Sequence, residues 1–240
     1  MLVLAFRYYL SLFIKDKQAT WMMSLLLFFV LPFHYFFPDS YHAFYWFDTP
    51  SLLFFTVGMI LLYKKKWIWF YPLFAVATLN RETTCFLTFI YLFTALGNER
   101  LLTIVFHCAA QFFIWMIIKT ALFVLFIDNP GSQAGFEISF HEQDVTHLAD
   151  NFHYFMNPKN VPSFLSIFGF VWIPVLFLHG QIKDQFVKRS LLVFIPQVCG
   201  MMIVANIYEL RIFSETIPVF LAAFCIILSE RCSFSRPQLQ

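Results

Sequence analysis

The sequence predicts an all-α fold, a polytopic bundle of about seven or eight transmembrane segments, some of them half-length. Of its 240 residues, 60% are hydrophobic and only 12% are charged, whereas a soluble domain usually carries about 25% charged residues. The apolar residues occur in runs along the whole chain, many of them close to the ~20 residues that a membrane-spanning helix needs. We therefore expect residues 1–240 to form a single transmembrane domain.

Six apolar runs are candidates for individual spans. They are residues 20–37, 44–63, 101–127, 161–179, 190–208 and, somewhat shorter, 212–228. The first apolar run, residues 2–14, is too short to cross a bilayer unaided. It is expected to be either an interfacial helix or the end of a span.

Residues 67–96 form a longer apolar run with Asn80, Arg81 and Glu82 at its middle. Basic residues usually lie on the cytoplasmic side of a membrane protein. All the basic positions can share that side only if this run is two short helices that meet near Arg81. The positions are Lys15 and Lys17, Lys64–Lys66, Arg100, the group Lys183, Lys188 and Arg189, and the pair Arg231 and Arg236.

The same topology places the 128–160 loop, which is rich in acidic residues, on the extracytoplasmic side. Within it, Val145, Leu148, Phe152 and Phe155 recur at helical spacing. This pattern predicts an interfacial amphipathic helix over 142–156 that ends before Pro158. The chain is thus expected to be a multi-pass protein of a bacterial inner membrane.

Most of the remaining ionisable residues gather at the predicted outer ends of the helices. An ionisable side chain at membrane depth costs about 2.5–3.5 kcal/mol on insertion scales, so it usually faces a cavity or a partner. The sequence therefore predicts a polar extracytoplasmic mouth. Its members are Asp39, Asp48, Arg81, Glu82, Lys119, Glu209, Arg211 and Glu215.

Two of the acids are candidates for catalysis. Asp39, in a predicted outer loop, is placed to act as a general base toward an acceptor hydroxyl. Asp48 is a second candidate, but its position just before Thr49 and Pro50 also fits a helix N-cap.

The cations of the mouth are candidates for binding a lipid phosphate. Arg211 can clamp a phosphate with paired hydrogen bonds, with Glu209 and Glu215 as supporting ion pairs. Arg81 and Lys119 are the other two cations. Each motif also has a purely structural interpretation: Arg81 and Glu82 can neutralise each other at a helix break, and Arg211 can anchor the interface through ion pairs.

No cofactor is expected. His147 and Asp150 share one face of the predicted amphipathic helix, but His141 and His153 point away from it, so a divalent metal there is not predicted. The five cysteines include no C-x-x-C pair, which gives no support to a zinc site. The net charge of +2 and the lack of an aromatic basic surface do not indicate nucleic acid.

The segment from Tyr45 to Leu53, a short basic turn, and an apolar run that ends in Asn80-Arg81-Glu82-Thr83 resemble bacterial polytopic glycosyltransferases of the GT-C type. The resemblance covers mainly residues 44–96. It implies sugar transfer from a polyprenyl-phosphate donor at the extracytoplasmic face. The outer-loop acid Asp39 would then be the base, with Arg211 or Arg81 on the lipid phosphate.

Two other classes of function fit the sequence. One is a non-catalytic accessory subunit of a larger membrane complex, which suits the aromatic lipid-facing surface and the small loops. The other is a small lipid or solute transporter with Lys119, Arg81 and the acids along its path. Membrane lipid is an expected partner in every case. A glycosyltransferase would also bind a polyprenyl-phosphate sugar, and an accessory subunit would bind another membrane protein.

Overall fold

The computed structural model describes residues 1–35, 47–128 and 147–234, with side chains up to Arg231. Throughout these residues the regular structure is helical, with no strand, as predicted. The α-helices are α1 (Leu2–Leu10), α2 (Lys17–Ser24), α3 (Leu27–Tyr35), α4 (Asp48–Tyr63), α5 (Trp67–Asn80), α6 (Phe86–Ala95), α7 (Leu101–Phe126), α8 (His147–Met156), α9 (Val161–Leu165), α10 (Trp172–Phe177), α11 (Gln185–Ser190), α12 (Phe194–Val204) and α13 (Ile217–Phe234). Short 3₁₀ helices connect or extend them: η1 (Glu82–Cys85), η2 (Ile167–Phe170), η3 (His179–Gln181), η4 (Leu191–Val193) and η5 (Leu210–Thr216).

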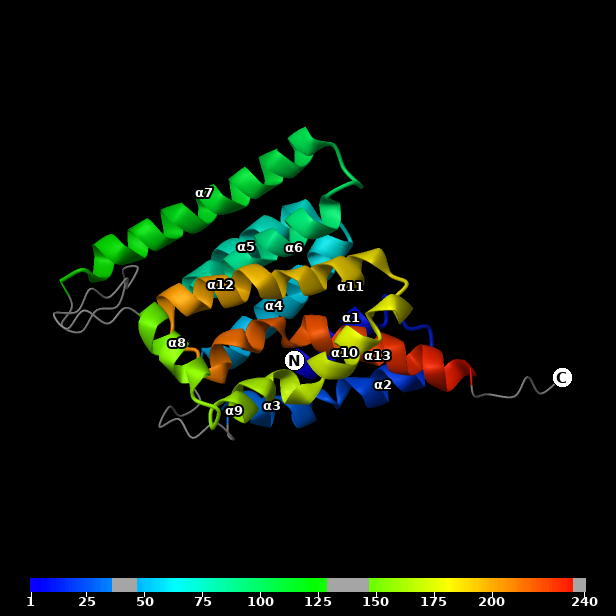
Figure 1. Ribbon diagram of the computed structural model, residues 1–240. Helices are drawn as coiled ribbons and strands as arrows, with labels where there is room; N and C mark the ends of the chain where they lie inside the picture. Colours follow the sequence, from blue (N-terminus) through cyan, green and yellow to red (C-terminus); the bar gives the residue numbers. More distant parts are fainter. Residues whose placement is uncertain (36–46, 129–146, 235–240) are drawn as a thin grey trace.

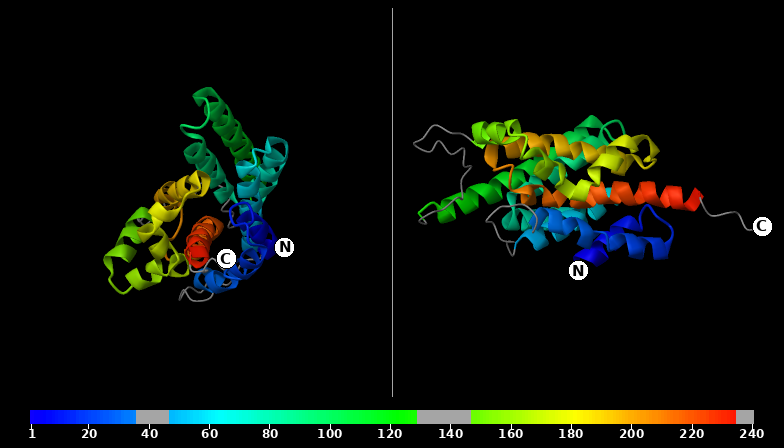
Figure 2. Two further views of the ribbon diagram at one scale, coloured as in Figure 1. Left: turned by 90° about the vertical axis from the view of Figure 1, so that its right-hand side faces the viewer. Right: turned by 60° about the horizontal axis from the view of Figure 1, so that its bottom comes forward.

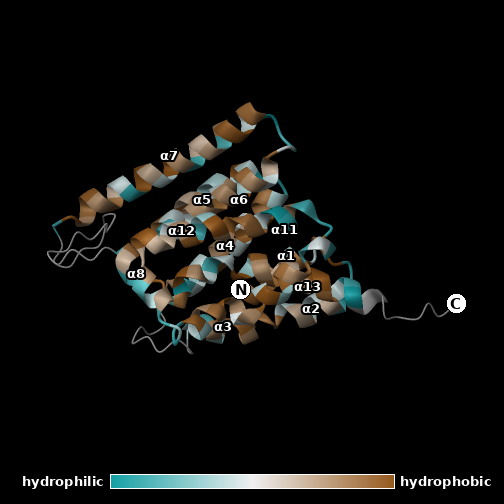
Figure 3. Ribbon diagram, viewed as in Figure 1, coloured by the Kyte–Doolittle hydropathy of each residue, from teal (hydrophilic) through white to brown (hydrophobic). Residues whose placement is uncertain are grey.

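Three helical stretches are long and apolar enough to cross a membrane: Leu101–Phe126, Gln185–Val204 and Leu210–Arg231. They differ greatly in burial. The last of them, which contains α13, is 83% buried and forms the centre of the bundle, whereas α7 is only 11% buried. Figures 1 and 2 show α7 at the edge of the bundle, where it packs mainly on α5, α6 and η1. Its outer face is apolar (Figure 3) and suits contact with lipid.

One end of the bundle collects the basic loops, and we call it the basic end. Here Lys65 Nζ lies 2.6 Å from Glu99 Oε1, and Arg189 donates a hydrogen bond to the carbonyl of Leu96. Lys183 pairs with Glu230 at 3.3 Å. The turns that follow α4, α6 and α10 and the C-terminal part of α13 therefore lie at the same end of the bundle, on the right-hand side of Figure 1.

This arrangement confirms that residues 67–96 form two helices rather than one. The chain breaks at Arg81, which has extended backbone angles of φ −160° and ψ 134°. Asn80 holds the break against the start of α4, because its amide donates to Phe47 O at 3.1 Å and Ser51 Oγ at 2.8 Å. The contact between Lys65 and Glu99 shows that the start of α5 and the end of α6 lie together at the basic end. One continuous span would place them at opposite ends.

Three expected segments differ from the structure. The 20–37 run is two helices, α2 and α3, rather than one. The 161–179 run is also broken, because Phe168, Gly169 and Phe170 adopt left-handed backbone angles between α9 and α10. The 2–14 run forms a helix only over Leu2–Leu10 (α1), whose Phe6, Tyr9 and Leu10 are fully buried in the bundle.

The amphipathic helix is confirmed over His147–Met156, and it ends before Pro158 as predicted; residues 142–146 lie outside the described residues. The side chain of Asn151 makes three hydrogen bonds that hold this helix against the bundle. The buried amide of Asn151 donates to Met202 O at 3.0 Å and Ala205 O at 2.7 Å, and accepts from the Ile207 N–H at 2.9 Å. Since Met202 lies in the last turn of α12 and Ala205 and Ile207 follow it, Asn151 satisfies backbone that the helix end leaves unpaired.

The Lys65–Glu99 contact predicts how stability depends on pH. Burial raises the pKa of the Glu99 carboxyl, but hydrogen bonds from Lys65 and Tyr91 and the charge of Lys65 outweigh burial, so this pKa lies below its ordinary value of 4.5. A depressed carboxyl pKa stabilises the folded state above the unfolded pKa, and this contribution is lost as the pH falls through the folded pKa. As the pH is lowered below about 4.5, we expect the unfolding temperature of the wild type in nanodiscs to decrease. The decrease should be smaller in Glu99→Gln.

The matched control is Glu230→Gln, which removes a more exposed ion pair at the same end. It should keep the wild-type dependence. A Glu99→Gln profile as steep as that of the wild type would show that other groups set the acid limit.

Candidate functional site

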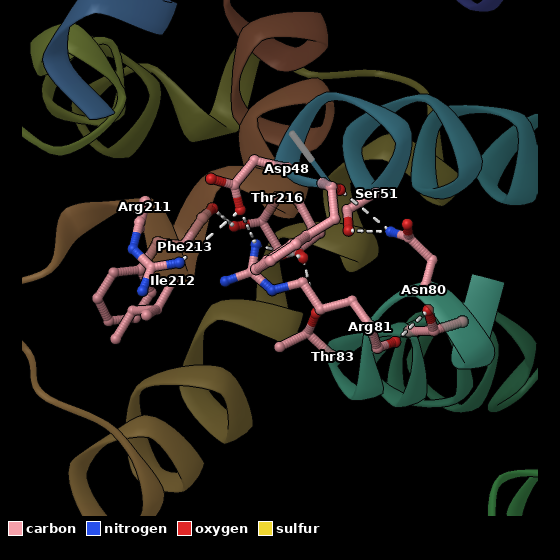
Figure 4. Close-up of polar contacts among 12 residues, drawn as sticks. Asp48, Ser51, Asn80, Arg81, Thr83, Arg211, Ile212, Phe213 and Thr216 are labelled. Atoms are coloured by element: carbon pink, nitrogen blue, oxygen red, sulfur yellow. Dashed lines mark hydrogen bonds and ion pairs between the residues drawn. The ribbon is translucent and has the colours of Figure 1, made fainter. Parts of the chain in front are cut away.

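Several of the ionisable residues expected at a polar mouth gather in a cluster at the end of the bundle opposite the basic end. Its centre is Arg81, whose Nη1 lies 3.0 Å from Asp48 Oδ1 and 3.0 Å from Glu215 Oε1. All three side chains are buried: 9% of the Arg81 side chain is exposed, 0% of Asp48 and 2% of Glu215. Arg81 lies at the break between α5 and η1, and its guanidinium therefore joins the start of α4 to η5 (Figure 4).

Neighbouring hydroxyl and amide groups fix this arrangement. Thr83 Oγ1 donates to Glu215 Oε1 at 2.6 Å, so the same carboxylate oxygen receives both Arg81 and Thr83. On the other side, Thr216 Oγ1 donates to Gln197 Oε1 at 2.9 Å, and Gln197 Nε2 donates to Ile212 O at 3.3 Å. The pair anchors η5, and with it Arg211 and Glu215, to α12.

Arg211 is the second cation of the site. Its Nη2 lies 2.6 Å from Glu209 Oε2, and its Nη1 lies 3.9 Å from Asp48 Oδ1. The carboxylate of Asp48 is thus flanked by two guanidiniums, with a hydrogen bond to Arg81 and a longer ion pair to Arg211. Arg211 is more exposed than Arg81, at 18% of its side chain, so it forms the outer edge of the cluster.

Lys119 and Glu82 form a separate pair on the side of α7. Lys119 Nζ lies 3.7 Å from Glu82 Oε2, and Trp115, one turn earlier on α7, donates its indole N–H to Glu82 O at 2.9 Å. Since α7 continues for seven residues beyond Lys119, it extends about 10 Å past this level at 1.5 Å per residue. The C-terminal end of α7 therefore extends beyond the Lys119–Glu82 pair and the charged cluster next to it.

The geometry changes two of the structural interpretations. Asp48 is the first residue of α4 and Phe47 occupies the N-cap position, so the N-cap interpretation is wrong; the Asp48 carboxylate pairs with Arg81. Arg81 and Glu82 do not neutralise each other, because Arg81 pairs with Asp48 and Glu215 while Glu82 pairs with Lys119. The ion pair expected between Arg211 and Glu209 is present.

Asp39 lies outside the described residues, so the structure does not place the predicted base. The residues that sequence analysis missed are the uncharged ones, Ser51, Thr83, Gln197 and Thr216. Thr83 adjoins the charged motif, which is a local signal. Gln197 gives no such signal, since it is an isolated amide in an apolar run.

His147 on the amphipathic helix makes a hydrogen bond to the bundle. His147 Nδ1 lies 2.9 Å from Asn206 Oδ1, which ties α8 to the turn before Arg211. Within the described ranges, no group of three or more His, Cys, Asp or Glu side chains is placed to hold a metal ion. His141, Glu142 and Asp144 lie outside those ranges.

Comparison of the chain with protein-family models, with curated proteins and with solved structures found no match.

The double bridge of Arg81 predicts a large effect on stability. Removing one partner of a buried ion pair typically costs about 3–5 kcal/mol, because it leaves uncompensated buried charge. We expect Arg81→Ala to lower the free energy of unfolding by this amount in mixed micelles, since Asp48 and Glu215 would then face each other. Adding Asp48→Asn and Glu215→Gln to that variant should recover most of the loss.

The control is Arg231→Ala at the basic end, where the side chain donates to Gln181 Oε1 at 3.1 Å and the expected cost is about 0–1 kcal/mol, as for exposed pairs. Equal effects of the two substitutions would contradict a structural role of the Arg81 bridge.

Proposed function

We propose that this chain is a multi-pass membrane glycosyltransferase-like protein of the GT-C type, which takes a sugar from a polyprenyl-phosphate donor at the extracytoplasmic face. The observation that carries the proposal is the convergence of Asp48, Arg81, Arg211 and Glu215 from three parts of the chain. Fixed cations beside carboxylates, at the end of an apolar bundle, provide groups that recognise a lipid phosphate.

The proposal includes about seven or eight membrane segments, with α4, α5 and α6 as short ones. α4 has 16 residues and α5 has 14, or about 24 Å and 21 Å, against about 30 Å of hydrocarbon. With the basic end in the cytoplasm, as the positive-inside rule favours, the charged cluster lies just inside the outer leaflet. A phosphate headgroup lies near this depth when its chain is in the bilayer.

The two arginines have different roles in this proposal. Arg81 is a positioning residue, because its guanidinium bridges two buried carboxylates. Arg211 is the phosphate-binding residue, since it lies at the exposed edge and a phosphate can compete there with Glu209. Lys119 is a second cation for the headgroup, in exchange with Glu82.

The carboxylates divide in the same way. Asp48 is fully buried, and its carboxylate pairs with the guanidiniums of both Arg81 and Arg211. We therefore assign Asp48 to positioning and keep Asp39 as the candidate base.

One observation favours a second function, a non-catalytic accessory subunit. Arg81 pairs with two buried carboxylates, those of Asp48 and Glu215, as expected of a cluster that only holds the fold together. In that case the chain would be isolated from membranes with a fixed partner and would not require a polyprenyl phosphate.

The first test is binding of polyprenyl monophosphate to the protein in nanodiscs, measured by native mass spectrometry. A hydrogen bond to a charged group contributes about 1.5–3 kcal/mol, so Arg211→Ala should weaken binding roughly ten- to hundredfold. Arg211→Lys should also bind less well, because lysine cannot form the paired hydrogen bonds of a guanidinium.

The matched control is Arg189→Ala, which removes an arginine from the basic end and should leave binding unchanged. If both alanine variants bind like the wild type, Arg211 does not contact the phosphate and the accessory-subunit function is favoured. If Arg211→Ala loses binding as expected but the wild type transfers no sugar, the protein is a lipid-phosphate-binding relative without activity.

The sidedness of the proposal has its own test. A cysteine in place of Phe152, whose side chain is 54% exposed on α8, should react with a membrane-impermeant thiol reagent in intact cells. A cysteine in place of Lys183 at the basic end should react only after permeabilisation. Both variants are made in a background without the native cysteines, and the reverse pattern would invert the proposed orientation.

A further inference from the structure

An apolar cavity lies away from the charged cluster, between α3, η2, α10 and α13. Its volume is 190 Å³, and carbon-rich residues line it, among them Val30, Gly169, Phe170 and Leu221. An apolar cavity of about 150 Å³ in another protein stays dry and admits benzene. This cavity therefore has the size and chemistry to hold several carbons of a hydrocarbon chain.

The cavity opens toward the lipid-facing surface of the bundle. Phe29 and Phe170 line it and are 57% and 43% exposed, whereas Leu221, at its inner wall, is 1% exposed. Toward the charged cluster, His34 lies one turn beyond Val30 and is buried. There the ring of Phe168 stacks on that of Phe220, with centroids 4.4 Å apart. A chain would thus enter from the bilayer rather than from the Arg211 end.

The wall of the cavity includes an unusual backbone turn. Phe168, Gly169 and Phe170 have φ angles of 56°, 59° and 63°, a left-handed conformation in which the Cβ of an ordinary L-residue crowds the following carbonyl. Such a conformation persists only where the surroundings hold it. Part of that support is the ring of Phe33, which lies 3.1 Å from the position that a Cβ on Gly169 would occupy.

His34 connects this turn to the charged cluster. Its Nε2 accepts a hydrogen bond from the Phe168 N–H at 3.1 Å, and its Nδ1 donates to Leu210 O at 2.8 Å. The imidazole is therefore neutral with its proton on Nδ1. Because Leu210 immediately precedes Arg211, a shift of the turn would be transmitted to the outer cation of the site.

We propose that this cavity binds an acyl chain of a bilayer phospholipid, and that the bound chain holds the 168–170 turn and, through His34, the position of Arg211. The occupant is a bilayer lipid rather than a lipid with its headgroup on Arg211, because His34 and the stacked Phe168 and Phe220 lie between the cavity and that residue. The proposal does not depend on sugar transfer.

Photolabelling tests the occupant. The wild type is reconstituted with phosphatidylethanolamine that carries a diazirine near the middle of one acyl chain, and labelled peptides are mapped by mass spectrometry. Label on Leu221, which surface lipid cannot reach, is expected. Leu26→Trp fills the cavity from its rim and should reduce that label several-fold, and Val171→Phe provides a second filling variant in case the first does not fold.

The control is Ile117→Trp, which adds the same side chain to the exposed face of α7 and should leave the Leu221 label unchanged. If the label appears on α7 but not on Leu221 in the wild type, no chain enters the cavity and the proposal is wrong.

Modification of Arg211 by phenylglyoxal tests the coupling. Removing lipid with detergent should raise the rate of modification several-fold in the wild type but not in Leu26→Trp, whose indole replaces the chain. His34→Ala should be fast with or without lipid. Arg189 at the basic end is the internal reference: an equal increase there would indicate general unfolding, and an unchanged Arg211 rate would show no coupling, so either result overturns this part of the proposal.

Discussion

The double bridge of Arg81 to Asp48 and Glu215 is the interaction on which the polar end of this bundle depends. Charged groups in an apolar surrounding are tolerated when they are paired and hydrogen-bonded, and here one guanidinium serves two carboxylates from helices far apart in the sequence. The bridge fixes the start of α4, the break after α5 and the whole of η5 relative to one another. The position of Arg211 follows, because it lies on η5 and its second carboxylate partner is Asp48.

The same requirement explains how the broken helices are stabilised. Backbone freed at a helix break cannot pair with water inside a membrane, so it needs an internal partner. Asn151 satisfies the end of α12, Gln197 contacts the carbonyl of Ile212, and His34 joins two irregular segments. These polar residues are buried among apolar neighbours, and each makes hydrogen bonds to backbone groups that a continuous helix would have paired by itself.

The sequence was informative where local pattern decides the structure. The basic residues at both ends of the 67–96 run predicted the hairpin of α5 and α6, and Pro158 predicted the end of α8. The breaks at Leu25 and at Phe168–Phe170 were not predictable, because no proline or charge marks them and tertiary contacts, such as those of His34 and Phe33, hold the second. The pairing of Arg81 was missed for the same reason: proximity in sequence favoured Glu82, whereas packing brought Asp48 and Glu215 closer.

In the proposed function, Arg81 stabilises the fold and Arg211 binds the ligand. A guanidinium that bridges two buried carboxylates cannot turn to a phosphate without leaving both acids uncompensated, which costs far more than the loss of one exposed pair. Arg211 can exchange Glu209 for another anion at a smaller cost, because both side chains are partly exposed. Asp48 lies between the two arginines, so Arg81 also sets the electrostatic field in which Arg211 works. An anion that binds Arg211 would therefore contact a guanidinium that Asp48 already orients. Such preorganisation lowers the entropic cost of binding.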